Sequence, residues 1–154
     1  MSDLAITFAD WLAITEAKAR YCRCLDTKDW AGYADVFAED AVLDTTGAGG
    51  PRVEGRAALA AFVQSSMGEA VTVHQVHSPE IRLTAPDAAE AVFAMQDRVI
   101  FPPARAAAIG MRGLTGYGHY HEEYRRCADG AWRISASRLT RLHVDTERDQ
   151  PPER

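Results

Sequence analysis

The chain has 154 residues, 47% of them hydrophobic and 25% charged, which is the composition of an ordinary globular domain able to bury a core. Its 17 basic and 22 acidic side chains give a net charge of −5, which argues against nucleic acid or an anionic membrane as main partner. No apolar run reaches the roughly 18 residues of a membrane span, and the N-terminus lacks the pattern of a signal peptide. Three cysteines without zinc-knuckle spacing fit reduced thiols, so we expect a cytoplasmic protein.

Three helices are predicted in the first half of the chain. The first covers residues 7–25, where apolar side chains recur at helical spacing at Trp11, Ile14, Tyr21 and Leu25. The second begins after Asp29, a suitable N-cap, and its buried stripe is Trp30, Tyr33 and Phe37. A short strand at 41–46 and a glycine-rich turn follow. The third predicted helix is Arg56–Met67, whose inward residues are Leu59, Phe62 and Val63.

From Val71 onward the pattern is that of strands. The predicted strands are Val71–Ser78, Glu80–Thr84, Ala89–Phe101, Leu114–Arg126 and Ala131–Leu142. Pro79 marks a break or bulge, and Pro86-Asp87 and Asp129-Gly130 are turns between neighbouring strands. The segment from Pro102 to Gly113 is expected to be a longer mobile connection that covers the mouth of a pocket.

These elements predict one α+β domain over residues 1–154, structured from about 7 to 143, with a charged, disordered tail over 145–154. We expect a cone-shaped, curved antiparallel or mixed sheet wrapped around three N-terminal helices. A cone with polar groups inside is a pocket.

Four short motifs occur in order along the chain: LDTKDW (25–30), HQVHSPEI (74–81), GYGHYHEEYRR (116–126) and DGAWRI (129–134). Together they resemble the SnoaL-like branch of the NTF2-like superfamily, over the range from about Ile14 to Leu142. Within that branch the chain is similar to scytalone dehydratase, the bile-acid dehydratases and hexachlorocyclohexane dehydrochlorinase. The resemblance implies an NTF2-like, cystatin-like α+β roll.

The resemblance also implies a histidine–aspartate dyad at His74 and Asp26. The bile-acid dehydratases add a tyrosine at Tyr21, a second aspartate at Asp97 and an arginine near Arg138. The scytalone dehydratase pattern is only partly met, since its tyrosine before the aspartate is Leu25 here and its second histidine falls near Phe101. The dyad has a physical basis: an imidazole titrates near neutrality, and a carboxylate on one ring nitrogen fixes the tautomer and stabilises the imidazolium.

Each candidate residue also has a structural interpretation. His74 on a strand is either a satisfied core residue or a proton-handling group, and Asp26 is either a turn residue or the partner of that histidine. Asp97 lies in an apolar strand, so it faces water, lines a pocket or pairs with an arginine of a neighbouring strand. Arg138 and Arg141 lie on opposite strand faces, and we favour Arg138 as the pocket residue.

One strand face carries alternating polar residues, His119, His121 and Glu123. They lack the further histidine of a cupin motif, so we expect a solvated or subunit-facing stripe and no metal. Tyr120 lies on the opposite face and is a candidate for lining the pocket.

The sequence therefore predicts a cofactor-independent lyase of the dehydratase type. His74 and Asp26 are the catalytic candidates, and the substrate-binding candidates are Tyr21, Asp97, Tyr120 and Arg138. We expect the substrate to be a small apolar cyclic or polycyclic molecule, with no nucleic acid, membrane or cofactor involved, and a homodimer or homotrimer. The alternatives are an isomerase or dehydrohalogenase with the same dyad, or a non-catalytic ligand-binding protein resembling the small subunit of a ring-hydroxylating dioxygenase.

Overall fold

In the computed structural model, which describes residues 4–148, one mixed sheet has the strand order β2-β1-β6-β5-β4-β3. Its strands are β1 (Phe37–Asp44), β2 (Arg52–Glu54), β3 (Val71–Ala85), β4 (Ala88–Ile100), β5 (Met111–Arg126) and β6 (Trp132–Arg148). β1 pairs parallel to β6, and the other neighbouring strands pair antiparallel. β2 and β3 are the two edges of the sheet.

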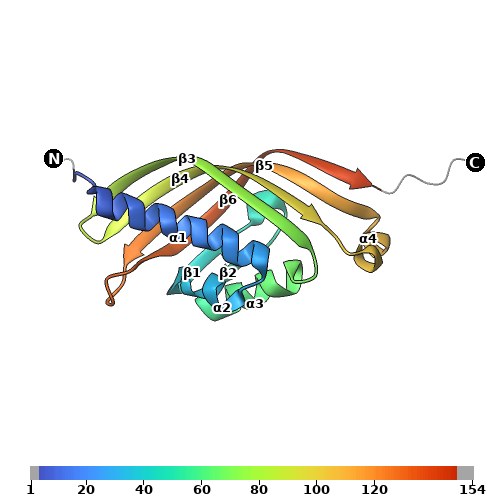
Figure 1. The fold of residues 1–154 in the computed structure, drawn as a ribbon, viewed down its shortest axis with the longest axis horizontal. Helices are drawn as coiled ribbons and strands as arrows, with labels where there is room; N and C mark the ends of the chain where they lie inside the picture. Colours follow the sequence, from blue (N-terminus) through green and yellow to red (C-terminus); the bar gives the residue numbers. More distant parts are fainter. Residues whose placement is uncertain (1–3, 149–154) are drawn as a thin grey trace, which may run out of the picture.

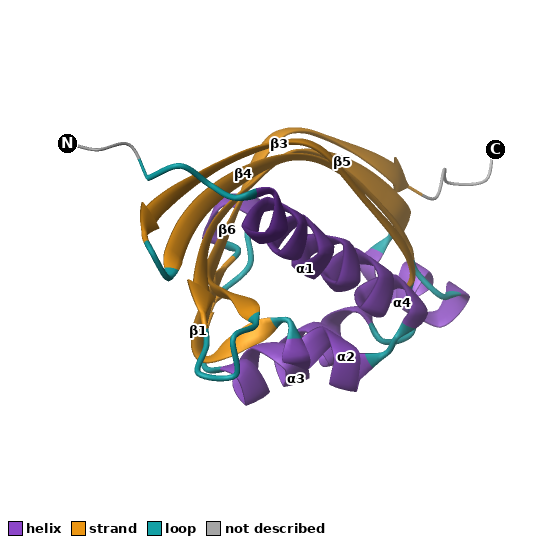
Figure 2. Cartoon of the chain, turned by 60° about the vertical axis from the view of Figure 1, so that its left-hand side comes forward, coloured by secondary structure: helices purple, strands orange, loops and turns teal. Residues whose placement is uncertain are grey.

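Four α-helices accompany the sheet in this range: α1 (Phe8–Thr27), α2 (Trp30–Asp35), α3 (Arg56–Met67) and α4 (Pro103–Ile109). Figure 2 shows the sheet curving over α1, with α2 and α3 closing the open side. Figure 1 shows α4 at the end of the sheet opposite to the β3–β4 turn. None of these helices is long and apolar enough to cross a membrane. The predicted α+β fold is confirmed, with α4 as an additional helix.

Local signals in the sequence explain where α1 begins and ends. The hydroxyl of Thr7 accepts the backbone N–H of Asp10 and caps the first turn. The helix ends at Lys28, which adopts the left-handed conformation with φ 62°. Asp29 then caps α2 by accepting the N–H of Gly32. α1 therefore stops where the chain has to turn beneath β3.

Strict alternation along β4 separates an inward from an outward face. Ala91, Phe93, Met95, Asp97 and Val99 point inward and are buried, whereas the residues between them are more exposed. Ala91, Phe93 and Met95 belong to the main core together with the buried stripe of α1, whereas Val99 belongs to a smaller core with Phe101 and with Ala106 of α4. Because α1, α2 and α3 all lie on the concave side, the outward face of the sheet is left without a covering helix (Figure 2).

The structure differs from the prediction in three segments. Phe37, predicted in the second helix, begins β1 and remains buried. The connection from Pro102 to Gly113 contains α4 instead of a structureless loop. β6 continues to Arg148, so residues 145–148 of the expected tail belong to the sheet; residues 149–154 lie outside the described range.

The interruption predicted at Pro79 is present as a bulge. The register of β3 against β4 shifts between His77 and Glu80, and Ser78 has a φ of 49°. The two predicted strands are therefore one bent strand, which lets β3 follow the curvature of the sheet.

Candidate active site

A cavity of about 350 Å³ lies between the concave face of the sheet and the helices α3 and α4. Most of its wall is apolar, with contributions from Leu43, Val63 and Leu139. Its polar lining residues are Tyr21, Thr45, Ser66, His74, Asp97, Arg105, Tyr120 and Arg141. An apolar cavity with a few converging polar groups is the usual form of a small-molecule site.

His74 and Asp26 are in direct contact at the side of this cavity. The Nδ1 atom of His74 lies 2.7 Å from Oδ1 of Asp26, and the backbone N–H of His74 donates to Oδ2 at 2.7 Å. The second contact is possible because β3 is an edge strand, whose outward N–H groups have no neighbouring strand to bind. The last turn of α1 thus brings Asp26 alongside the unpaired edge of β3.

The environment of Asp26 favours its ionised form. Burial raises the pKa of this carboxyl, but the hydrogen bonds and charge of His74 and the hydroxyl of Thr72 outweigh burial, so that the pKa is lowered below its usual value. At neutral pH a carboxylate therefore faces the imidazole ring.

This contact determines which nitrogen of His74 can react. With a carboxylate on one side, the neutral ring keeps its proton on Nδ1 and leaves the lone pair on Nε2. The His74 side chain is only 8% exposed, and the residue lines the cavity. Nε2 can accept a proton from a bound molecule, and Asp26 would stabilise the resulting imidazolium.

Asp97 lies beside His74 and is paired with Arg141. Asp97 is the direct register partner of His74 across β3 and β4. Its two carboxylate oxygens accept from the two terminal nitrogens of Arg141 at 2.7 and 2.8 Å. Burial opposes the charge of Arg141, but the hydrogen bonds that it donates to Asp97 and the charge of that carboxylate outweigh burial and raise the pKa of the guanidinium. A row of polar groups therefore runs across the sheet from Asp26 to Arg141.

Gly116 creates the space for this ion pair. β5 lies between the strands of Asp97 and Arg141, so their side chains meet over its backbone. A Cβ atom on Gly116 would lie 2.0 Å from Nη1 of Arg141 and 2.4 Å from Oδ1 of Asp97. A glycine is therefore required where the two side chains cross.

The prediction that Arg138 faces the pocket is wrong, because a bulge reverses the alternation of β6. Ile134 is buried on the inner face, and uninterrupted alternation would place Arg138 there as well. The register between β5 and β6 shifts after Ile134, which puts Ser137, Leu139 and Arg141 inside. Arg138 is exposed and borders a separate hollow with His121.

Tyr21 and Tyr120 form an aromatic part of the cavity wall. Their rings meet edge to face with centroids 5.7 Å apart. The ammonium group of Lys18 lies 3.7 Å and 3.4 Å from the two ring centroids. Burial is the first cause that raises the pKa of both phenols well above the usual value. Both hydroxyl groups therefore stay protonated and can donate hydrogen bonds.

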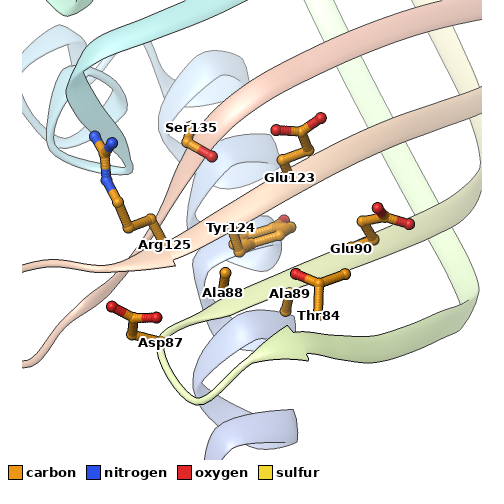
Figure 3. A pocket seen from close by; sticks show the side chains of 9 residues that line it. All are labelled: Thr84, Asp87, Ala88, Ala89, Glu90, Glu123, Tyr124, Arg125 and Ser135. Carbon is orange, nitrogen blue, oxygen red and sulfur yellow. The ribbon is translucent and has the colours of Figure 1, made fainter. Parts of the chain in front are cut away.

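The polar stripe predicted on β5 lies on the outward face. His121 contacts the hydroxyl of Thr140 at 3.0 Å, and no group of three potential metal ligands was found within residues 4–148. Another hollow, of about 270 Å³, lies near the β3–β4 turn, and Asp87, Glu90 and Glu123 are among its lining residues. Figure 3 shows these side chains around it. No residue of the described range lines both this hollow and the cavity, so the two are separate.

Three residues near the site were not predicted. Arg105 on α4 lines the cavity, and its guanidinium donates to the backbone carbonyl of Ser66 on α3. Thr72 shares the inward face of β3 with His74, a spacing of two that the sequence does display. Lys28 occupies the position at the end of α1 where glycine is usual. A lysine at such a position is the sequence feature that could have drawn attention to it.

Comparison with known proteins assigns the family. The family model described as a SnoaL-like domain matches residues 7–138, which is most of the chain. The protein therefore belongs to the SnoaL-like family, and the resemblance drawn from the four sequence motifs is confirmed.

Solved structures agree on the fold. A protein of Novosphingobium aromaticivorans suggested to be an aromatic ring hydroxylase is 23% identical with a TM-score of 0.81, covering 92% of this chain and 96% of its own. A suggested scytalone dehydratase of the same organism is 17% identical with a TM-score of 0.77 and coverage of 92% and 90%. A type 2 hexachlorocyclohexane dehydrochlorinase (LinA) is 15% identical with a TM-score of 0.77 and coverage of 94% and 95%.

Proposed function

We propose that the protein is a cofactor-independent lyase of the dehydratase type, acting on a small apolar cyclic or polycyclic molecule. The observation that carries the proposal is the 2.7 Å contact between Asp26 and His74 at the wall of an apolar cavity. The cavity volume of about 350 Å³ is within the range of roughly 300–1,000 Å³ typical of small-molecule sites. The suggested scytalone dehydratase among the structural neighbours supports the same class.

In this proposal His74 is the general base and acid. Its Nε2 atom removes the proton next to a carbonyl group of the substrate, and Asp26 stabilises the imidazolium that forms. The electron pair of the broken C–H bond forms the new double bond, and the hydroxyl on the neighbouring carbon departs with its bonding electrons. His74 returns the proton to this hydroxyl, so that water leaves and the enzyme is regenerated.

The remaining polar residues position the substrate oxygen. Tyr21 and Tyr120 offer protonated hydroxyls for the carbonyl, and the Asp97–Arg141 pair fixes the polar end of the cavity beside His74. A hydrogen bond that strengthens as negative charge develops on the carbonyl oxygen lowers the barrier to proton removal.

The same base serves a dehydrohalogenase, and the hexachlorocyclohexane dehydrochlorinase among the neighbours makes this the second candidate. A halide leaves without needing a proton, so only dehydration requires His74 to act as an acid. Cyclic ketones carrying a hydroxyl or a chloride next to the acidic carbon distinguish the two activities. The new conjugated double bond is measured by its ultraviolet absorbance.

The test compares Asp26→Asn, His74→Ala and the double variant with a His143→Ala control, whose side chain is exposed. Asn keeps the volume but removes the charge, so the loss of rate approaches about 10⁴, by analogy with a protease triad. His74→Ala loses roughly 10²–10⁴, and the double variant is little worse than either single one. Normal turnover by Asp26→Asn, or losses that multiply, would contradict the proposed dyad.

A further inference from the structure

We propose that Lys28, acting through Thr72, is a positioning residue that lowers the basicity of His74. This inference rests on the proposed function, because it assigns a role toward the same histidine. Lys28 is not among the residues that line the cavity; it reaches the carboxylate of Asp26 through the hydroxyl of Thr72.

A continuous chain of contacts joins Lys28 to His74. The ammonium Nζ donates to Oγ1 of Thr72 at 3.0 Å, and this hydroxyl donates to Oδ1 of Asp26 at 2.9 Å. The same Oδ1 atom lies 2.7 Å from Nδ1 of His74. Thr72 is 3% exposed, so the middle of the chain is shielded from water. Thr72 and His74 therefore share one carboxylate oxygen.

Lys28 has a backbone conformation that is unusual for a lysine. Lys28 ends α1 in the left-handed region at φ 62°, where glycine is the favoured residue. The chain contains only two lysines, Lys18 and Lys28, among its 17 basic residues. A lysine thus occupies a position where glycine would relieve strain, and its ammonium group donates to Thr72, which in turn donates to Asp26.

The sign of the effect follows from the charges. The positive charge of Lys28 disfavours a second positive charge on His74. The Thr72 hydroxyl competes with Nδ1 of His74 for hydrogen bonding to Oδ1 of Asp26, which weakens the stabilisation of the imidazolium. Both effects favour the neutral ring. They oppose Asp26, which favours the imidazolium.

Other ionisable groups surround His74 and remain unchanged in the test. They come from α1, β4, β5, β6 and α4: Tyr21, Asp26, Asp97, Tyr120, Arg141 and Arg105. Arg141 is held by Asp97 at 2.7 Å, so this pair responds little to a change at Lys28. The effect of Lys28 is therefore separable by substituting Lys28 alone.

The experiment is a pH titration of His74 followed by NMR of its ring protons in the intact protein, with no substrate present. The chain has five histidines, and a His74→Gln spectrum identifies the resonance. Lys28→Met is expected to move the titration of the His74 ring protons to higher pH, because it removes the positive charge that is joined to Asp26 through Thr72. Lys28→Arg keeps the charge and is expected to leave the titration close to that of the wild type.

Lys28→Gly separates charge from backbone strain. It should raise the pKa of His74 as Lys28→Met does, while the protein becomes no less stable in thermal unfolding, because glycine fits the left-handed position. Thr72→Val should raise the pKa in the same direction, and Thr72→Ser, which keeps the hydroxyl, should restore it. Adding Lys28→Met to Thr72→Val should produce less than the sum of the two shifts.

A His74 titration that is unchanged in both Lys28→Met and Lys28→Gly overturns the inference and leaves Lys28 as a helix-capping residue. This readout needs no turnover, so it is independent of the proposed activity. If His74→Ala keeps full activity while the titration shifts as expected, the proposed dyad fails and the Lys28 coupling stands. If His74→Ala is inactive but the titration does not shift, the coupling fails and the dyad stands.

Discussion

Asp97 carries a charge that the fold has buried, and Arg141 is the residue that compensates it. The side chain of Asp97 is 6% exposed, and both of its oxygens are bound by the Arg141 guanidinium. An ion pair in such a place contributes little net stability, but loss of one partner leaves an isolated charge inside the protein. Removal of Arg141 and removal of Arg138, another arginine of β6, are therefore expected to have different effects on stability.

Arg141→Met is expected to destabilise the protein strongly, and Arg138→Met is the matched control on the same strand. Stranding the charge of Asp97 costs roughly 3–5 kcal/mol, toward the lower figure because Arg141 is partly exposed. Arg138 is exposed, and its removal should change the free energy of unfolding by about 0.5 kcal/mol or less. Urea unfolding at pH 7 measures both, and equal losses would contradict the assignment of Arg141 to the buried pair.

Individual site residues could be predicted where they belong to a short sequence motif. His74 and Asp26 were identified through their motifs, and their contact agrees with that expectation in geometry. Arg141 was missed because one inserted residue in β6 reverses the strand face, and alternation cannot reveal a bulge. Lys28 was missed because its conformation is visible only once the end of the helix has been placed.

At the scale of elements, α1 is anchored to the sheet by a polar contact inside the core. Lys18 of α1 and Glu122 of β5 are fully buried, with Nζ 2.6 Å from Oε1. Glu122 also accepts from Ser137 at 2.9 Å and from Tyr124 at 2.6 Å. Because every oxygen of Glu122 has a partner, the network fixes how α1 sits against β5 and β6.

Lys18→Met should destabilise the protein by roughly 3–5 kcal/mol, since it leaves Glu122 charged without a cation. The double variant Lys18→Met with Glu122→Gln should recover part of this loss, because the remaining amide is neutral: its oxygen accepts from one of the hydroxyls of Ser137 and Tyr124, and its NH2 group donates to the other. Denaturant unfolding of the single and double variants gives the coupling energy. Additive losses would show that the two side chains do not act as a pair.

The elements themselves were largely predictable, and the errors have physical causes. The limits of Arg56–Met67 match because apolar periodicity and flanking glycines agree there. Phe37 was assigned to a helix because its spacing from Tyr33 is helical, yet it packs against Tyr33 from the first position of β1, with ring centroids 5.2 Å apart. Neighbouring segments can thus bury aromatic side chains together without sharing a helix.

At the scale of the molecule, the outward face of the sheet bears apolar side chains near the end that holds α4. Val71 is 60% exposed, Val73 46%, Ile100 42% and Tyr117 36%, and all four belong to β3, β4 or β5. Exposed apolar residues that gather on one face are typical of contact surfaces. The dimer or trimer expected from the sequence stays a prediction, and this face is where we expect the contact.

Sedimentation at micromolar concentration should give the mass of a dimer or a trimer of the 16.9 kDa chain. Val73→Glu places a charge on this face and should shift the protein toward the monomer. Gln75→Glu adds the same charge two positions along the outward face of β3, at a residue that is already polar, and serves as the control. A wild-type protein that sediments as a monomer would refute self-association.

The parallel pairing of β1 with β6 has a consequence for how the protein is made. Phe37 and Leu43 of β1 have their partners at Ile134 and Ser137, so the ribosome releases β1 long before the strand that binds it. Contacts between residues so distant in the chain form slowly, and β1 and β5 present open edges in the meantime. Arg141 also emerges well after Asp97, so the nascent chain holds an uncompensated carboxylate. The cavity is completed only after β6 has been synthesised.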